Sequence, residues 1–336
     1  MYNCVLICTY NRHFKYLYKF IQSLILHNKD PQYTDIYLSF DNVSQLNQFQ
    51  KLYPNLKMYK FIKYISLDII LKDLFNEFSE SINQVKVNCI NDKRKTRNKW
   101  VAIKRSYSII YLKKIGVDYT LCLDSDGMCV NKISFNEIFS EYDKSNFILV
   151  SDKHRLLKNK NRIKEINIQI LKSFLRYDSK NSVHKKLAKC SVRQNDLWII
   201  NCSQFCKFIN DIILKNRKSV SKIMFICESW YYELWLYHKK LIGELDIEIV
   251  NFKHIFPDYN ITNYDFHGES SKLSKFVVEI LVKKNEKDVY KNIDLLNQFY
   301  FNRCRIWRGE YYLNLKKINP ILCNKLNITL LSSNYQ

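Results

Sequence analysis

Residues 117–127, Val-Asp-Tyr-Thr-Leu-Cys-Leu-Asp-Ser-Asp-Gly, constrain the chain most, because an apolar run ends there in two carboxylates and a glycine. Residues 119–123 have the length and composition of a buried β-strand. Asp124 and Asp126 are two positions apart, so in an extended chain both side chains point to the same side. Two adjacent carboxylates repel each other unless a cation lies between them.

Oxygen ligands beside open coordination positions suit Mg²⁺ or Mn²⁺, held jointly by the protein and a phosphate-bearing ligand. The acidic pair therefore predicts a metal-dependent enzyme that acts on a phosphorylated donor. The alternative is that Asp124 and Asp126 lie in a solvated turn without a metal.

The N-terminal part of the chain alternates strands with helices. Strands are expected over residues 2–8, 35–40 and 57–64, with helical spacing over 14–25 and 43–52. This order is typical of a parallel sheet with helices on its faces, which binds ligands at the carboxyl ends of its strands. We therefore expect Thr9, Asp41 and Asp124 to lie along one edge of the sheet.

The rest of the chain continues the α/β pattern. Helices are expected over residues 61–78 and 99–114 and from about 205 and 226, strands over 147–150, 197–201 and 247–252, and a polar basic connection over 86–99. Gly116 is placed to end the helix that precedes it. Residues 151–193 are rich in Lys and Arg and read as a basic insertion over the site, with one helical patch at 163–175.

We expect one catalytic domain over residues 1–274. Its donor-binding half covers about 1–130 and its acceptor half 131–274. Residues 275–336 are expected to form a mainly helical C-terminal extension.

The charge of the chain favours an anionic partner. Its 54 Lys and Arg residues outnumber 32 Asp and Glu residues, which gives a net charge of +22 among 336 residues. Nucleic acid, an anionic lipid surface, and a nucleotide-linked or acidic substrate all remain open. A Lys-rich composition can equally reflect the coding bias of an AT-rich genome.

The cysteines and the apolar runs indicate the cellular compartment of the protein. The 11 cysteines form no CxxC pair and several lie in strand-like runs, so we expect reduced core residues. A strand beginning near Met1 leaves no room for a signal peptide, and no apolar run approaches the ~18 residues that cross a bilayer. We expect a cytoplasmic protein, with peripheral contact to an anionic membrane as an option. Neither a P-loop nor a GxGxxG fingerprint is present.

Three segments together resemble the GT-A glycosyltransferases. Residues 5–12, Val-Leu-Ile-Cys-Thr-Tyr-Asn-Arg, are similar to the first strand and nucleotide-binding turn of that fold. Asp124-Ser125-Asp126 is similar to its DxD metal motif, and Trp198-Ile199-Ile200-Asn201 to the strand after the acceptor loop. The resemblance covers roughly residues 2–270. It implies a Rossmann-like fold, with a mostly parallel central sheet and helices on both faces.

A looser resemblance connects Arg105, residues 117–119 and Glu228-Ser229 with the retaining transferases of the blood-group type. This similarity settles neither the sugar nor the stereochemical outcome.

The resemblance assigns roles to the residues of the donor site. It implies that Asp126 binds Mn²⁺ or Mg²⁺ directly, while Asp124 binds the metal through water or holds the donor ribose. Asp41 is the candidate partner of the nucleobase, and other donor contacts are expected from Thr9, Tyr10, Arg12, Arg105 and Ser125. The alternatives are a helix N-cap for Asp41 and an exposed, solvated side chain for Arg105.

The reacting carboxylate is expected at Glu228, with Asp196 and Glu233 as competitors. Trp230 and Tyr231 could offer a sugar an apolar face, although such aromatics are more often core residues. The resemblance also implies that His267 adds a metal ligand or diphosphate contact, and that Lys272 helps to close the same loop. His267 lacks the Lys-Pro-Trp that usually follows such a histidine.

The leading hypothesis is transfer of a sugar, most simply from a UDP-sugar, to a glycan or glycolipid acceptor. The basic insertion and basic C-terminus would meet an acidic glycan or anionic lipid head groups. One alternative is a Mg²⁺-dependent protein that binds or processes nucleic acid, against which no nuclease-like carboxylate cluster or binding motif is found. Another is a catalytically inactive GT-A scaffold.

Overall fold

The computed structural model describes residues 1–92, 99–144, 147–151, 160–194 and 199–251, and further along 306–308, 317, 320–321 and 330–332. A central sheet has the strand order β3-β2-β1-β4-β8. Its strands are β1 (Asn3–Cys8), β2 (Asp35–Phe40), β3 (Ile62–Ser66), β4 (Tyr119–Asp124) and β8 (Ile199–Asn201). The first four are parallel and β8 runs antiparallel to β4. The expected α/β fold with a mostly parallel sheet is confirmed.

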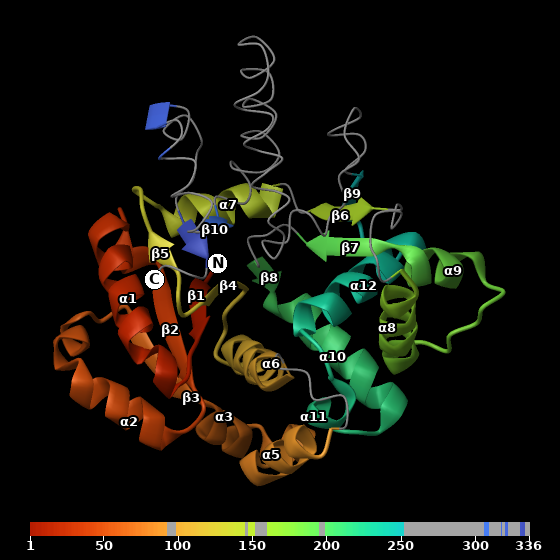
Figure 1. Cartoon of the computed structure of the whole chain (residues 1–336), viewed down its shortest axis with the longest axis horizontal. Helices are drawn as coiled ribbons and strands as arrows, with labels where there is room; N and C mark the ends of the chain where they lie inside the picture. Colours follow the sequence, from red (N-terminus) through yellow and green to blue (C-terminus); the bar gives the residue numbers. More distant parts are fainter. Residues whose placement is uncertain are drawn as a thin grey trace.

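Helices cover both faces of this sheet (Figure 1). On one face, Phe14 and Phe49 both pack edge-on or tilted against Phe40 of β2, at ring distances of 5.9 and 5.3 Å. On the other, Leu6 shares a buried core with Ile103 and with residues of several further helices. The covering helices are α1 (Phe14–His27) and α2 (Val43–Leu52) on the first face, and α6 (Lys99–Lys114), α10 (Cys202–Asn216) and α12 (Glu228–Leu241) on the second.

Two smaller sheets complete the described structure. Their strand orders are β7-β6-β9 and β10-β11-β5. Their strands are β5 (Met128–Cys129), β6 (Phe147–Ser151), β7 (Ser191–Gln194), β9 (Glu248–Asn251), β10 (Ile306–Arg308) and β11 (Leu330–Ser332). In the expected helical extension the described strands are β10 and β11, and most of residues 275–336 lies outside the description. The domain boundary near 274 stays a prediction.

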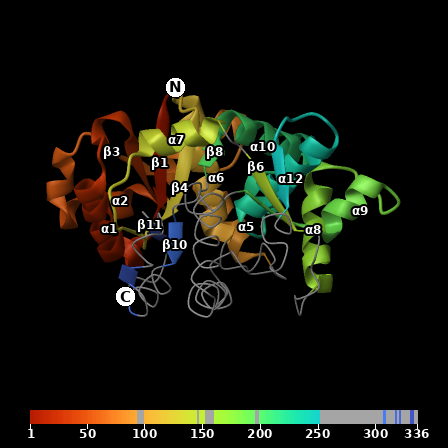
Figure 2. The same cartoon turned by 90° about the horizontal axis from the view of Figure 1, so that it is seen from above.

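The basic insertion contains two helices where one was expected. These are α8 (Lys160–Phe174) and α9 (Ser182–Lys189). The Asn181 side chain caps α9 by accepting a hydrogen bond from the His184 amide. Viewed from above, α8 and α9 lie at the opposite end of the molecule from α1 and α2 (Figure 2).

The predicted helix over 99–114 and strand over 35–40 are confirmed, and Gly116 follows the helix with a φ of 93°. Three predictions are partly wrong: the strand over 57–64, the helix over 61–78 and the polar connection over 86–99. Strand β3, which pairs with β2, extends into the range predicted as a helix, and the helix capped by Ser81 extends into the range predicted as a connection. The elements found there are η3 (Pro54–Met58), β3, α3 (Leu67–Asp73), α4 (Phe75–Phe78) and α5 (Ile82–Ile90). Pairing with a buried neighbour strand outweighs the helical spacing in this region.

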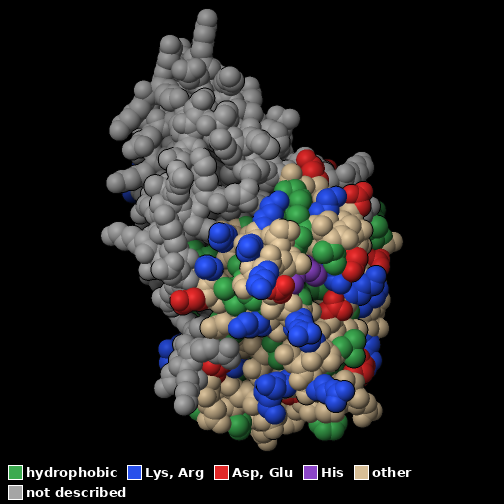
Figure 3. All heavy atoms as spheres, turned by 90° about the vertical axis from the view of Figure 1, so that its right-hand side faces the viewer, with side chains coloured by type: hydrophobic (Ala, Val, Ile, Leu, Met, Phe, Trp, Pro, Cys, Tyr) green, Lys and Arg blue, Asp and Glu red, His purple; other side chains and the backbone are tan. Residues whose placement is uncertain are grey.

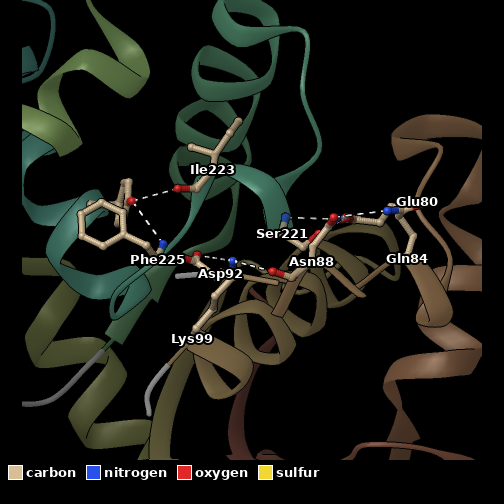
Figure 4. Close-up of polar contacts among 9 residues, drawn as sticks. Glu80, Gln84, Asn88, Asp92, Lys99, Ser221, Ile223 and Phe225 are labelled. Carbon is tan, nitrogen blue, oxygen red and sulfur yellow. Dashed lines mark hydrogen bonds and ion pairs between the residues drawn. The ribbon is translucent and has the colours of Figure 1, made fainter. Parts of the chain in front are cut away.

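A buried polar network fixes α5 against α6 and the short helix α11 (Val220–Ile223) (Figure 4). The Glu80 carboxylate is fully buried and accepts hydrogen bonds from Tyr107 and Ser221. The Asn88 amide nitrogen lies 2.7 Å from the Ser221 hydroxyl, and Lys99 forms a buried ion pair of 2.6 Å with Asp92. These contacts hold the segment that leads into α12. Among the described residues, no helix has the length and apolar character needed to cross a membrane.

Candidate active site

The register of the parallel strands brings three chain segments to one edge of the sheet. Cys8 of β1 lies opposite Ser39 of β2 and Asp124 of β4. Thr9, Asp41 and Asp124 therefore lie together at this edge, as the sequence predicts.

The Asp41 carboxylate is held by donors from two helices. Lys104 Nζ lies 2.6 Å and Trp100 Nε1 2.9 Å from Oδ1, while Gln45 Nε2 lies 3.2 Å from Oδ2. Lys104, which is 1% exposed, also donates to the Thr9 carbonyl and so ties β1 to β2. The alternative role of Asp41 as a helix N-cap is wrong, because Asn42 caps α2.

Arg105, the next residue of α6, joins two carboxylates that are far apart in the sequence. Its guanidinium donates to Glu228 Oε1 at 2.6 Å and to Asp124 Oδ1 at 3.0 Å. The side chains of Arg105 and Glu228 are 3% and 1% exposed, whereas that of Asp124 is 52% exposed. Burial alone lowers the pKa of Arg105, but the Glu228 and Asp124 charges raise that pKa well above its usual value. The alternative of an exposed, solvated Arg105 is wrong.

The acidic motif is a turn and not an extended segment. Strand β4 ends at Asp124, and Gly127 N–H faces the Asp124 carbonyl at 3.4 Å. The prediction that Asp124 and Asp126 point to the same side of an extended chain is therefore wrong, because the chain is no longer extended after Asp124. Ser125 is 4% exposed, and its hydroxyl lies 2.9 Å from His13 Nδ1.

His13 connects the two loops that the sequence singled out. Its Nε2 lies 2.5 Å from the Tyr10 hydroxyl, and its ring packs at 4.1 Å from that of Tyr10. The imidazole thus bridges the turn after β1 and the turn after β4. The sequence analysis missed His13, although it directly follows the Thr-Tyr-Asn-Arg turn.

Three of the carboxylates at this edge are paired with cations of α6. Lys104 pairs with Asp41, and Arg105 pairs with both Asp124 and Glu228. Across the described ranges, no three His, Cys, Asp or Glu side chains gather around a common metal position. Asp124 and Asp126 thus offer carboxylate oxygens suited to a divalent ion, with its remaining ligands supplied by a bound molecule or water.

Several predicted site residues lie elsewhere or outside the description. Arg12 is exposed in the turn after β1, and its donor contact stays a prediction. Tyr231 is fully buried in the core, where no sugar can reach it. Glu233 is buried in α12 and lies about 140° around the helix from Glu228, on a different side. The residues outside the described ranges are Asp196, His267 and Lys272.

Two further site residues, Trp100 and Lys104, were not assigned roles from the sequence. Trp100 and Lys104 lie four positions apart on α6, within the helix predicted over residues 99–114. The sequence feature that could have identified them is their position on the helix that precedes the acidic strand.

Comparison with known proteins finds no matching family model and no matching curated protein. Among solved structures, S. aureus TarS has a TM-score of 0.35 and 15% identity, over 90% of this chain but 43% of that chain. TarS residues 1–349 have a TM-score of 0.34 both alone, at 13% identity, and in complex with UDP, at 12% identity. The match to the structure without UDP covers 96% of this chain and 77% of that one, and the match to the UDP complex covers 98% and 88%. The chain thus spans less than half of the first TarS structure, and TM-scores below 0.5 leave the function to be judged from the site itself.

Proposed function

We propose that the chain is a glycosyltransferase that transfers a sugar from a nucleotide-diphosphate donor to a glycan or glycolipid acceptor. The observation that carries the proposal is the row of ion pairs along the carboxyl edge of the sheet. There α6 places Lys104 against Asp41 and Arg105 against Asp124. A ligand with a base at one end and a diphosphate at the other fits a row of this kind.

Asp41 is proposed as the partner of the nucleobase. Lys104 and Trp100 both donate to Oδ1, and Gln45 donates to Oδ2. Because a carboxylate oxygen accepts more than one hydrogen bond, Oδ2 retains the capacity to accept from a base N–H. Thr9 and Tyr10 follow β1 beside it.

Asp126 is proposed to bind Mn²⁺ or Mg²⁺ directly, with Asp124 acting through water or on the donor ribose. The Asp124 carboxylate, whose side chain is 52% exposed at the end of β4, supports this assignment. The ion would supply positive charge to the leaving diphosphate. Asp124 itself is oriented by Arg105, and the turn by the contact of Ser125 with His13.

The predicted reaction of Glu228 with the acceptor or the anomeric carbon requires this side chain to leave Arg105. Glu228 is 1% exposed and its Oε1 is occupied by the guanidinium. We favour a positioning role, in which Glu228 holds Arg105 and thereby Asp124. The reacting carboxylate is then still to be identified, and Asp196 remains a candidate.

Hydrolysis of UDP-, GDP- and CMP-sugars with Mn²⁺, and with a chelator in its place, tests the proposed function. We expect turnover of one donor class that requires the metal. Asp126→Ala should abolish it, whereas Asp246→Ala, which removes an exposed carboxylate in the loop between α12 and β9, should not. If no donor is turned over, tight oligonucleotide binding would favour a nucleic-acid protein, and its absence an inactive scaffold.

A further inference from the structure

Helices α8 and α9 carry a concentrated positive charge. Residues 160–194 contain ten Lys and Arg residues but only two acidic residues. Seven of the basic side chains are exposed, and one of them, Lys186, lies over the Tyr237 ring at 5.6 Å. We call the other six the basic α8–α9 surface: Lys164, Lys172, Arg176, Lys180, Lys185 and Lys189. Figure 3 shows the face of the molecule that includes these helices, on which Lys and Arg side chains are widespread.

The rest of the described chain is close to charge balance. Residues 1–92 contain ten basic and eight acidic residues, 99–144 contain seven and six, and 199–251 contain seven and six. A genome-wide bias toward Lys would raise all of these segments together. The excess in 160–194 is local, so composition alone does not account for it.

The ion pairs among the described residues also distinguish these six side chains. Within the described ranges none of them forms an ion pair, whereas at the end of α12 Lys239 pairs with Glu244 at 2.6 Å and Lys240 with Asp246 at 2.9 Å. Unpaired cations on one surface repel each other and attract a common anionic partner.

The surface begins beside the candidate active site. Asn167 of α8 accepts a hydrogen bond of 2.9 Å from Trp230 Nε1, in the first turn of α12 next to Glu228. Further along, the rings of Phe174 and His238 lie 5.9 Å apart. Helices α8 and α12 therefore run in the same direction, with Lys164 at the site end. Because α8 is about 22 Å long, its exposed cations extend well away from the site.

We propose that the basic α8–α9 surface binds a polyanionic glycan, a chain with repeated phosphate, sulfate or carboxylate groups, whose end reaches the candidate active site. The further assignment of this glycan as the acceptor rests on the proposed transfer reaction. The charge spacing along two helices fits an extended polymer better than a single anionic group.

Two other polyanions fit less well. In residues 163–190 the apolar side chains turn inward, as Leu171 and Leu187 do, and no large apolar side chain there is exposed for insertion into a lipid surface. Tyr177 is half-buried and stacks on His184 at 5.8 Å, so it is not a free platform for a nucleobase.

The test compares two variants that lose the same charge. The surface variant replaces Lys172, Arg176, Lys180, Lys185 and Lys189 with Gln; the control replaces the exposed Lys51, Lys57, Lys60, Lys63 and Lys86, which belong to the N-terminal region, with Gln. Binding to heparin, to phosphatidylserine vesicles and to a single-stranded oligonucleotide is measured at low and high salt. Donor hydrolysis is measured in parallel.

We expect the wild-type protein and the control to bind heparin more tightly than vesicles or oligonucleotide. The surface variant should bind heparin at least about ten-fold more weakly at low salt, with a shallower salt dependence. Equal binding by the two variants, or tighter binding of vesicles or oligonucleotide by the wild type, would overturn the proposal. Donor hydrolysis should be the same in all three proteins, so a failure of the transferase assignment shows up separately from a failure of glycan binding.

Discussion

Arg105 and Glu228, which are 123 positions apart in the chain, form an ion pair of 2.6 Å between side chains that are 3% and 1% exposed. The same guanidinium reaches Asp124 at the rim of the sheet. The pair therefore connects α12 to the acidic turn through α6.

Removing one partner of this pair should destabilise the protein strongly. Arg105→Ala leaves Glu228 charged and buried, at a cost of about 3–5 kcal/mol in the free energy of unfolding. Urea denaturation measures this change. Lys114→Ala is the control, because Lys114 pairs with Asp73 at 3.0 Å with both side chains more than 40% exposed. That loss should be much smaller, because a solvent-exposed ion pair contributes little to stability. Equal losses for the two variants would contradict the buried pair.

His13 and Ser125 should act on donor binding as one unit. Loss of their hydrogen bond removes about 0.5–1.5 kcal/mol, which corresponds to a KM for the donor up to about ten-fold higher. His13→Ala, Ser125→Ala and the double variant form a cycle in donor hydrolysis. The double variant should be little worse than the poorer single variant. Fully additive losses would mean that the 2.9 Å contact does not orient the turn.

Much of the fold was predictable because strands alternate with helices, and polar residues stand at or directly after the ends of β1, β2 and β4. That logic placed Thr9, Asp41 and Asp124 on one edge, and the register confirms their alignment. It also predicted α6 with its observed bounds. These features depend on local spacing, which a single sequence records.

The counter-charges were not predictable in the same way. The acidic pair was expected to need a metal for charge balance, yet Arg105 already compensates Asp124 from a neighbouring helix. Its contact with Glu228 depends on how α12 packs against α6, which no local pattern encodes. The strand β3 was misplaced for a related reason, since its bounds follow from pairing with β2.

Two partly buried thiols, those of Cys206 and Cys227, should resist alkylation in the folded protein. Burial, followed by the nearby Glu228 charge, raises the pKa of Cys227 to about 12, and burial raises that of Cys206 to about 11. At pH 8 the reactive thiolate is then a very small fraction. Mass spectrometry after iodoacetamide treatment should find both cysteines slow to react until urea is added. Rapid labelling of Cys227 without urea would contradict this.

Stability should fall in mild acid partly because of His238. Burial, then the charges of Lys239 and His184, lower the pKa of His238, while Glu244 and Asp211 oppose the shift. As the pH falls below about 6.5, the unfolded chain takes up this proton before the folded protein does, so stability declines. His238→Gln should flatten the change in urea midpoint with pH over this range. An unchanged slope would exclude the contribution of His238.

The most direct test of the central claim is a crystal structure of the protein with Mn²⁺ and UDP, read by anomalous scattering from manganese. The account predicts a manganese peak against Asp126, with the diphosphate bound to it and the base near Asp41. A turn without manganese, with UDP bound at some other place, would contradict the assignment of this edge of the sheet as a donor site.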